Sequence, residues 1–292
     1  MAQKTKKKHT MEWIAGGVIL LAAGVLLALV IWVVNALDFS GTPPATTPAP
    51  SVTQNRPTVS PAPTMAANPY GPGDFEYKNG YLTCVSGPSV LGIDVSEFQG
   101  QIDWQAVATT DVKIAMIRLG FRAWGEKGEV VADAYAKANL QGAKEAGLKV
   151  GVYFFSQAIT VEEARQEARF VLAMLDGQSL DMPVVFDWET VADPTARTAN
   201  MTKEKLNACA IAFCQEIQAA GYRAMVYFNP DIASRLMDIL VMEQMGFELW
   251  LAMYTDVMTY PYQVDMWQYS CGGKVKGILV PVDMNLYFTY EE

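Results

Sequence analysis

The 292-residue sequence predicts an α/β fold class: an irregular eight-stranded β/α (TIM-like) barrel with helices missing late in the chain, preceded by a transmembrane helix and a disordered linker. From residue 91 onward, eight apolar, strand-like runs occur, and helical stretches alternate with most of them. This alternation favours a parallel barrel over an open, doubly wound sheet. Connections too short for full crossover helices separate the last three runs, which predicts that helices are missing there.

The segment before the barrel begins with a long apolar run, WIAGGVILLAAGVLLALVIWVV. These residues, 13–34, carry no charge and reach the roughly 20 residues that a helix needs to cross a bilayer. A cleaved signal peptide has a shorter apolar stretch, so a retained signal-anchor helix is predicted. The lysines of residues 1–12 predict a cytoplasmic basic tail by the positive-inside rule. The expected topology is a single-pass membrane protein with a cytoplasmic N-terminus and an extracellular remainder.

Two segments connect this span to the barrel. Residues 35–72 are rich in Pro, Thr and Ala and lack apolar periodicity, so they are predicted to form an extracellular linker, with a plain spacer and a glycosylated stalk as open alternatives. Residues 73–90 predict a short hairpin lead-in, because two aromatic runs flank the turn signal Asn79-Gly80. The predicted barrel occupies residues 91–292.

End signals support the barrel's helices. Gly147 has the position of a C-terminal cap, and Thr160 and Glu163 have the spacing of a capping box. Thr202 is placed as an N-cap and Gly221 as a stop. The predicted helices are 131–147, 160–175 and 202–221, and the predicted strands are 91–96, 112–120, 148–156, 182–189, 222–229, 248–255, 263–270 and 282–288.

Composition excludes several kinds of chemistry. The only histidine, His9, lies in the N-terminal lysine cluster, which excludes Ser-His and Cys-His nucleophilic systems and most histidine-ligated metals. The net charge of -9 makes nucleic acid a poor partner. The four cysteines have no CxxC spacing, so no metal site is predicted; a Cys84–Cys271 bridge and four small buried thiols remain alternatives. Acid–base chemistry therefore falls to carboxylates.

Four carboxylates are expected to meet at one rim of the barrel. In VVFDWE, Asp187 and Glu189 are two residues apart on a strand, so their side chains project together while Trp188 faces the opposite side. Asp94 lies on the first strand and Asp283 on the last, and these strands become neighbours when a barrel closes. Taken alone, the Asp-x-Glu spacing of Asp187 and Glu189 is also consistent with a solvated strand end that has no catalytic role. Crowded acids are typical of glycoside cleavage, in which one carboxyl donates a proton and another stays anionic.

Aromatic residues recur near the predicted strand ends, where their rings could stack on sugar faces. Alternate positions on barrel strands face the helices, so most of these rings belong to the core. Four of them are still expected to line a groove: Tyr153, Tyr227, Trp267 and Tyr269.

The order and spacing of six motifs resemble glycoside hydrolase family 25, the Chalaropsis-type muramidases. The motifs, spread over about two-thirds of the chain, are GIDVSEFQGQIDW, DAYAKANLQGAKEAGLKVGVYFF, VVFDWE, LWLAMY, WQYS and VDMN. The resemblance implies hydrolysis of the β-1,4 bond between N-acetylmuramic acid and N-acetylglucosamine, with retention of configuration and no metal or organic cofactor.

The resemblance also implies roles for individual residues. Glu189 corresponds to the general acid and Asp187 to its partner carboxylate, which either attacks the sugar or orients the substrate's acetamido group as the nucleophile. The acetamido route is favoured, because the N-acetylmuramic acid whose bond is cut carries that group. Asp94 and Asp283 correspond to further active-site acids. Arg118 is expected to keep a positive charge for substrate binding, in a stretch that departs from the family pattern.

The expected partners are peptidoglycan glycan strands and, through one N-terminal helix, the membrane; nucleic acid is excluded. Two other functions remain open: a peptidoglycan-binding or scaffolding module that does not cut, and a chitinase-like N-acetylglucosaminide hydrolase. All four acids are present, which favours hydrolysis over binding alone.

Overall fold

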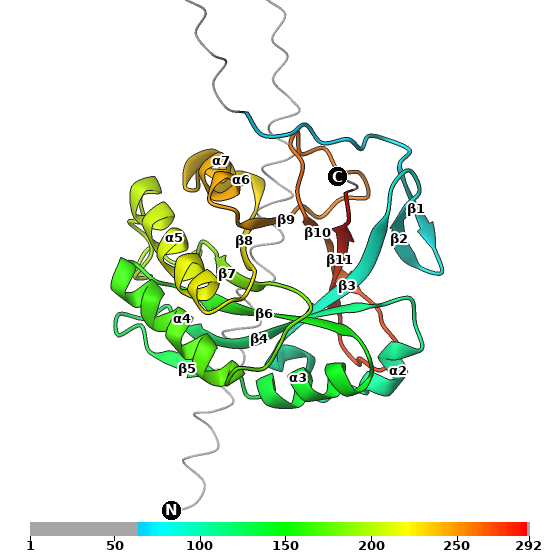
Figure 1. The fold of residues 1–292 in the computed structure, drawn as a ribbon, viewed down its shortest axis with the longest axis horizontal. Coiled ribbons are helices and arrows are strands. Elements are labelled where there is room, and N and C mark those ends of the chain that lie inside the picture. Colours follow the sequence, from blue (N-terminus) through cyan, green and yellow to red (C-terminus); the bar gives the residue numbers. More distant parts are fainter. Residues whose placement is uncertain (1–63, 291–292) are drawn as a thin grey trace, which may run out of the picture. The chain divides into compact units, whose positions relative to one another are not determined.

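The computed structural model describes residues 64–290 (Figure 1). Eight strands close into a barrel in the order β3-β11-β10-β9-β8-β7-β6-β4, and β4 pairs back with β3. The predicted eight-stranded barrel is therefore confirmed. Its strands are β3 (Ser89–Val95), β4 (Ile114–Arg122), β6 (Lys149–Ser156), β7 (Val184–Trp188), β8 (Ala224–Phe228), β9 (Glu248–Ala252), β10 (Met266–Gly273) and β11 (Val282–Phe288).

The last strand breaks the parallel arrangement. All neighbouring pairs in the ring are parallel except those of β11, which runs antiparallel to both β10 and β3. The expectation of a parallel barrel is wrong for this strand, because the short β10–β11 connection contains no crossover helix. As a result, the beginning of β11 lies at the rim where the other strands end.

Three long helices cover the outside of β4 to β8 (Figure 1). The predicted caps Thr160 and Thr202 are confirmed, since their hydroxyls accept hydrogen bonds from the amides of Glu163 and Lys205. The first helix begins later than predicted, because residues 130–132 pair with β4 as a short strand. These elements are β5 (Val130–Ala132), α3 (Ala136–Glu145), α4 (Val161–Leu175) and α5 (Lys203–Ala219).

Helices become short and then disappear late in the barrel, as predicted. Two short helices connect β8 to β9, and in the described chain no helix follows β9 or β10. Near the start, two brief turns of helix follow β3. These elements are α6 (Pro230–Arg235), α7 (Ile239–Gln244), the 3-10 turn η1 (Glu97–Gln99) and α2 (Trp104–Ala108).

The barrel wall separates two apolar layers. Inside, a small cluster fills the lumen, and outside, a larger cluster packs between the strands and the covering elements. Trp188 is in the outer cluster, as expected from its alternation with Asp187. The lumen cluster consists of Ile114, Met116, Tyr153, Met182, Val185, Met225, Tyr227, Trp250, Ala252 and Met266.

The predicted hairpin is confirmed as β1 (Phe75–Lys78) and β2 (Tyr81–Cys84). Asn79 and Gly80 both have positive φ, which a two-residue turn of this kind requires.

Part of the predicted linker lies against the barrel. Asn68 donates from its side-chain amide to the carbonyl of Tyr260, and Ala67 bridges to Tyr262. Residues 64–72 are therefore not a free spacer, because an asparagine and the packed ring of Tyr70 find partners on the barrel. Within residues 64–290, no helix has the length and apolar character to span a membrane. The predicted tail, span and first part of the linker, residues 1–63, lie outside the described chain.

Candidate active site

Four carboxylates come together at the rim where the parallel strands end. Asp94 near the end of β3 is directly opposite Asp283 near the start of β11. Asp187 is the penultimate residue of β7, and Glu189 follows that strand by one residue. The antiparallel direction of β11 is what brings Asp283 to the same rim as the other three.

Asp94 is buried and held by two amides. The side-chain nitrogens of Gln268 and Asn285 each donate to its Oδ2, both at 2.8 Å. Charge-assisted hydrogen bonds of this kind contribute about 1.5–3 kcal/mol each, which offsets part of the cost of burying a carboxylate. Burial still raises the pKa of Asp94, although both amides act in the opposite direction.

Aromatic residues fix the orientation of these two amides. Trp250 donates from its indole nitrogen to Oδ1 of Asn285 at 2.9 Å, which turns the Asn285 nitrogen toward Asp94. The hydroxyls of Tyr227 and Tyr254 donate to Oε1 of Gln268 at 2.8 and 3.1 Å. Both amide nitrogens must therefore face Asp94, and its Oδ2 acts as an acceptor.

Asp283 holds a proton next to this acceptor. Burial, the negative charge of Asp94 and a hydrogen bond with Asp94 raise the pKa of Asp283 to about 9. At neutral pH the protonated Asp283 donates to the Asp94 carboxylate. The pair therefore carries one negative charge and not two.

Asp187 and Glu189 also retain protons beyond the usual range of carboxyls. Burial, followed by the negative charge of Asp94, raises the pKa of Glu189 to about 7. Burial and the charges of Glu189 and Asp94 raise the pKa of Asp187 well above its usual range, while Arg118 acts against this rise. Oδ1 of Asp187 is buried and has no hydrogen-bond partner among residues 64–290. The site thus combines an acid protonated near neutral pH with an unpartnered carboxylate oxygen.

The backbone at Glu189 is fixed by the end of β6. The buried Gln157 donates from its side-chain nitrogen to the carbonyl of Glu189 at 3.0 Å and accepts from the Thr198 hydroxyl at 2.9 Å. Arg197 donates to the carbonyl of Gln157 at 2.8 Å and pairs with Glu163 on α4. Thr198 and Arg197 therefore fix Gln157, and Gln157 in turn holds the Glu189 carbonyl in place.

Of the residues expected to bind substrate, three lie on the carboxylate side of the wall. Tyr153 and Tyr227 are in the lumen, packed edge-on against Trp250 with ring centroids 6.2 and 5.1 Å away. Arg118 lies close enough to act on the pKa of Asp187, and its guanidinium donates to Asp133 at 2.8 Å and to Glu97 at 3.1 Å. Both tyrosines are buried, so they form the floor below the carboxylates.

The other two expected groove residues lie on the wrong face of β10. Trp267 is fully buried outside the barrel, where Phe75 of the hairpin packs on its ring and its indole nitrogen donates to the Met253 carbonyl. Tyr269 accepts a hydrogen bond from the Leu82 amide of the hairpin. Because strand residues alternate, Gln268 between them points inward to Asp94.

Sequence reasoning missed Gln268 and Asn285, and it left the supporting Trp250 and Tyr254 among the aromatic residues of the core. For Asn285 a signal existed, since it lies two residues beyond Asp283 and alternation places both on one face of β11. Gln268 is a single polar residue between two aromatic ones, the pattern expected of an inward-facing polar group under a covered outer face.

The described cysteines form no disulfide, and the described acids form no metal-binding cluster. Among the residues described, no group of histidine, cysteine and acidic side chains is arranged to bind a metal ion. All four cysteines are free, which excludes the Cys84–Cys271 bridge in this structure. The alternative of four buried thiols holds for three of them, since Cys271 is exposed.

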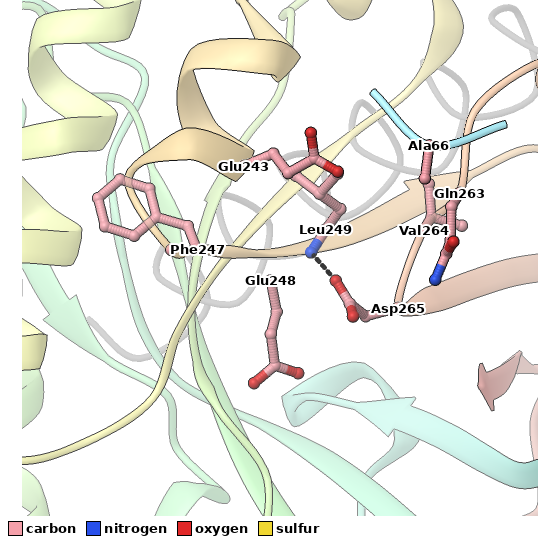
Figure 2. A pocket seen from close by; sticks show the side chains of 9 residues that line it. Ala66, Glu243, Phe247, Glu248, Leu249, Gln263, Val264 and Asp265 are labelled. Carbon is pink, nitrogen blue, oxygen red and sulfur yellow. Dashed lines mark hydrogen bonds between the residues drawn. The ribbon is translucent and has the colours of Figure 1, made fainter. Parts of the chain in front are cut away.

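A well-formed pocket lies at the other end of the barrel, where β9 and β10 begin (Figure 2). It has a volume of about 240 Å³ and is lined by Glu243, Glu248 and Asp265, with Ala66 and Gln263 at its side. The Leu249 amide donates to Asp265 at 2.7 Å. This pocket lies away from the four carboxylates, which are at the opposite rim.

Comparison with known proteins identifies the family. The model of glycosyl hydrolases family 25 matches residues 93–278. Uncharacterized protein YegX of Escherichia coli strain K12 is 28% identical over 213 residues, covering 68% of this chain and 70% of that protein. The autolytic lysozyme of Clostridium acetobutylicum is 26% identical over 203 residues, covering 66% of this chain and 54% of the lysozyme.

Solved structures agree at the level of the fold. The modular autolysin LytC from Streptococcus pneumoniae, in complex with a synthetic peptidoglycan ligand, has a TM-score of 0.62 at 20% identity. That match covers 73% of this chain and 52% of LytC, about half of its length. A family 25 glycosyl hydrolase from Bacillus anthracis has a TM-score of 0.57 at 18% identity, covering 75% of this chain and 94% of its own. With its four-carboxylate rim and a family match over most of the barrel, the chain belongs to glycosyl hydrolases family 25 and is a lysozyme-like glycoside hydrolase.

Proposed function

We propose that the protein is a peptidoglycan muramidase that uses Glu189 as its general acid and retains the configuration of the sugar. It cleaves the β-1,4 bond between N-acetylmuramic acid and N-acetylglucosamine. One observation carries the assignment of the acid: burial and Asp94 raise the pKa of Glu189 to about 7, close to neutral, whereas the pKa of Asp283 is raised to about 9. A general acid is most effective when its pKa lies near the working pH.

Bond cleavage begins with proton transfer from Glu189 to the glycosidic oxygen. The bond between that oxygen and C1 of the muramic acid breaks, while the carbonyl oxygen of the same sugar's acetamido group attacks C1. Asp187 accepts a hydrogen bond from the acetamido N–H, a role supported by its unpartnered Oδ1, and the positive charge that develops on the sugar favours the ionised form of its carboxyl. Water then attacks C1, the bond between C1 and the acetamido oxygen breaks, and the water's proton passes to Glu189, so two inversions leave the configuration retained.

The Asp94–Asp283 pair supplies negative charge next to the reacting carbon. Asp94 is held in position by Gln268 and Asn285, so its charge need not reorganise as positive charge develops on the sugar ring. Asp283 keeps the total charge of the rim low by retaining its proton.

The bond cleaved is tested by the sugar left at the new reducing end. Purified peptidoglycan is digested, reduced with borohydride and hydrolysed, and the reduced amino sugars are separated. Muramitol is the expected product. Glucosaminitol as the product would replace this proposal with chitinase-like or glucosaminidase chemistry, and intact glycan that is nevertheless bound would replace it with a scaffolding role.

The nucleophile is tested with glycan strands whose muramic acid has lost its N-acetyl group. If the acetamido oxygen attacks C1, these strands resist cleavage even though they still bind. Cleavage at an unchanged rate would instead assign the attack to Asp187 itself, through a covalent glycosyl-enzyme intermediate.

The dependence of activity on pH tests the acid. Because Glu189 donates only when protonated, kcat is expected to fall as the pH rises through about 7. Asp94→Asn removes the charge that contributes to the raised pKa, so the alkaline limb of the residual activity should move to lower pH. An alkaline limb at the same pH in both proteins would contradict the role of Glu189.

The enzyme acts outside the cell, held to the membrane by residues 13–34 with residues 1–12 in the cytoplasm. This part of the proposal is supported by the uncharged 22-residue segment and the lysines that precede it. Cell fractionation should find the full chain with membranes, and protease added to intact wall-free cells should remove the barrel. Recovery of the full chain in the soluble fraction would refute this anchoring.

A further inference from the structure

Three apolar side chains are exposed beside the carboxylates. Phe98 is 68% exposed, Leu279 is 94% exposed and Val280 is 42% exposed. Single exposed apolar residues need no explanation, but a group of them at one place marks a binding surface. These three belong to two loops that meet at the active-site rim.

The strands place the two loops side by side. Asp94 is directly opposite Asp283, and β3 and β11 run in opposite directions, so the chain leaving β3 and the chain entering β11 extend from the same point. Phe98 is on the first of these segments, and Leu279 is on the second. The Gln99 side chain joins them by donating to the carbonyl of Pro281 at 3.2 Å.

The backbone that carries Phe98 is fixed, and its ring contacts Arg118. The turn that carries it is capped by Ser96, whose hydroxyl accepts from the Phe98 amide at 3.3 Å. The guanidinium of Arg118 lies 5.0 Å from the ring centroid, and Arg118 is itself fixed by Asp133. One face of the ring therefore rests on Arg118, and the exposed remainder is available to a ligand.

A fixed, exposed aromatic ring next to a glycosidase site suits one ligand chemistry. The C–H groups on one face of a pyranose form an apolar surface that packs against an aromatic ring, as one apolar face packs on another. The methyl of an N-acetyl group is matched by small apolar side chains such as Leu279 and Val280. Arg118, which supports the ring, is directly opposite the lumen residue Tyr153 in the β4–β6 pairing, so the ring lies beside the barrel lumen.

We propose that Phe98, Leu279 and Val280 form a ledge that binds an N-acetylated sugar of the glycan strand outside the pair whose bond is cut. This inference rests on the proposed muramidase function. It adds a binding position for the polymer and predicts that long strands are better substrates than short ones.

The experiment measures kcat and KM on soluble glycan strands, with stem peptides intact or removed. Phe98→Ala is expected to raise KM about 3- to 10-fold on both substrates with little change in kcat. Phe98→Tyr should restore the wild-type KM, because it keeps the ring. The matched control is Tyr262→Ala, which removes another exposed aromatic ring, in the loop before β10, and should change neither constant.

Two outcomes would overturn the ledge. One is a KM for Phe98→Ala equal to that of the wild type on both substrates. The other is a KM increase only on strands that carry stem peptides, since the ledge would then bind peptide and not sugar.

Binding in a catalytically disabled background separates this inference from the proposed function. Glu189→Gln and the double variant Glu189→Gln/Phe98→Ala are compared for their dissociation constants with peptide-free strands. About 3- to 10-fold weaker binding by the double variant supports the ledge even if the wild type fails to release muramic acid ends. Equal binding refutes the ledge even if the muramidase assay succeeds.

Discussion

The two rims of the barrel both carry acidic residues, and they differ in how those acids are balanced. Where β9 and β10 begin, Glu248 pairs with Arg223 at 2.9 Å and accepts from the Tyr287 hydroxyl at 2.9 Å. Asp265 accepts from the backbone amide of Leu249 (Figure 2). At the other rim, Asp187 has a buried oxygen without a partner among the described residues, and Asp283 shares a proton with Asp94.

This comparison shows which features of an acidic cluster indicate chemistry. The rim whose carboxylates are paired also has a pocket of about 240 Å³, so neither a concave shape nor a group of acids by itself identifies the active site. Burial raises the pKa of Glu248 and Asp265 as well, so the other rim is distinguished by a buried acceptor left free for substrate, next to a carboxyl pair that shares one proton.

Asp187→Asn should show the largest effect among changes that leave Glu189 intact. The variant cannot stabilise a positively charged intermediate or attack C1, so kcat is expected to fall about 10²- to 10⁴-fold. Initial rates of reducing-end release measure it, with circular dichroism to verify folding. A decrease in kcat of less than about tenfold would mean that Asp187 matters no more than a carboxylate of the opposite rim, and it would contradict the mechanism.

Gln268→Leu should produce an intermediate loss. It removes one of two amide donors to Asp94 and leaves the hydroxyls of Tyr227 and Tyr254 without their acceptor. Loss of a hydrogen bond to a charged group costs about 1.5–3 kcal/mol, which corresponds to a decrease of about 10- to 100-fold in kcat. Tyr269→Phe, on the outer face of the same strand, is the control and should keep wild-type kcat; an equal loss in both would show a general defect of β10.

Asp283→Asn should change stability in a pH-dependent way. The folded protein keeps the Asp283 proton up to about pH 9, whereas the unfolded chain releases it near pH 4, so the folded state binds more protons between these values. Stability contributed by this group is therefore lost as the pH rises, and the non-ionisable Asn avoids the loss. Thermal melts should match wild type near pH 4 and exceed it at pH 8 by more than about 4 °C. A lower melting temperature at pH 8 would contradict the shared proton.

Glu248→Gln at the opposite rim should have the smallest effect. Its pair with Arg223 is half-exposed, and such pairs contribute about 0–1 kcal/mol to stability. Activity on purified peptidoglycan should stay within about twofold of wild type. A large loss of activity would mean that the pocket of Figure 2 takes part in catalysis.

Much of the fold follows from local patterns, and so does the meeting of the acids. Alternation on VVFDWE places Asp187 with Glu189, and ring closure brings Asp94 to Asp283. The sequence could not predict that the side chains of Trp267 and Tyr269 lie on the outer face of β10, because that face is covered by a hairpin that is remote in sequence. An apolar covering removes the contrast between the two faces of a strand, so aromatic residues alone do not reveal which face is inside.

The proline-rich composition likewise led to a wrong prediction for residues 64–72, which were expected to belong to a linker. Their order depends on two side chains, Asn68 and Tyr70, which find partners more than 180 residues away. Composition describes a segment's own tendency to fold, and it does not register partners supplied by a surface formed elsewhere in the chain.

The most direct test compares one carboxyl group from each rim, Glu189 and Glu248, for its contribution to activity. Glu189→Gln and Glu248→Gln each replace an ionisable carboxyl with an amide and keep the size of the side chain. Rates of muramic acid reducing-end release from purified peptidoglycan should fall at least about 100-fold for Glu189→Gln and stay within about twofold for Glu248→Gln. Comparable rates for the two variants would contradict the assignment of Glu189 as the general acid.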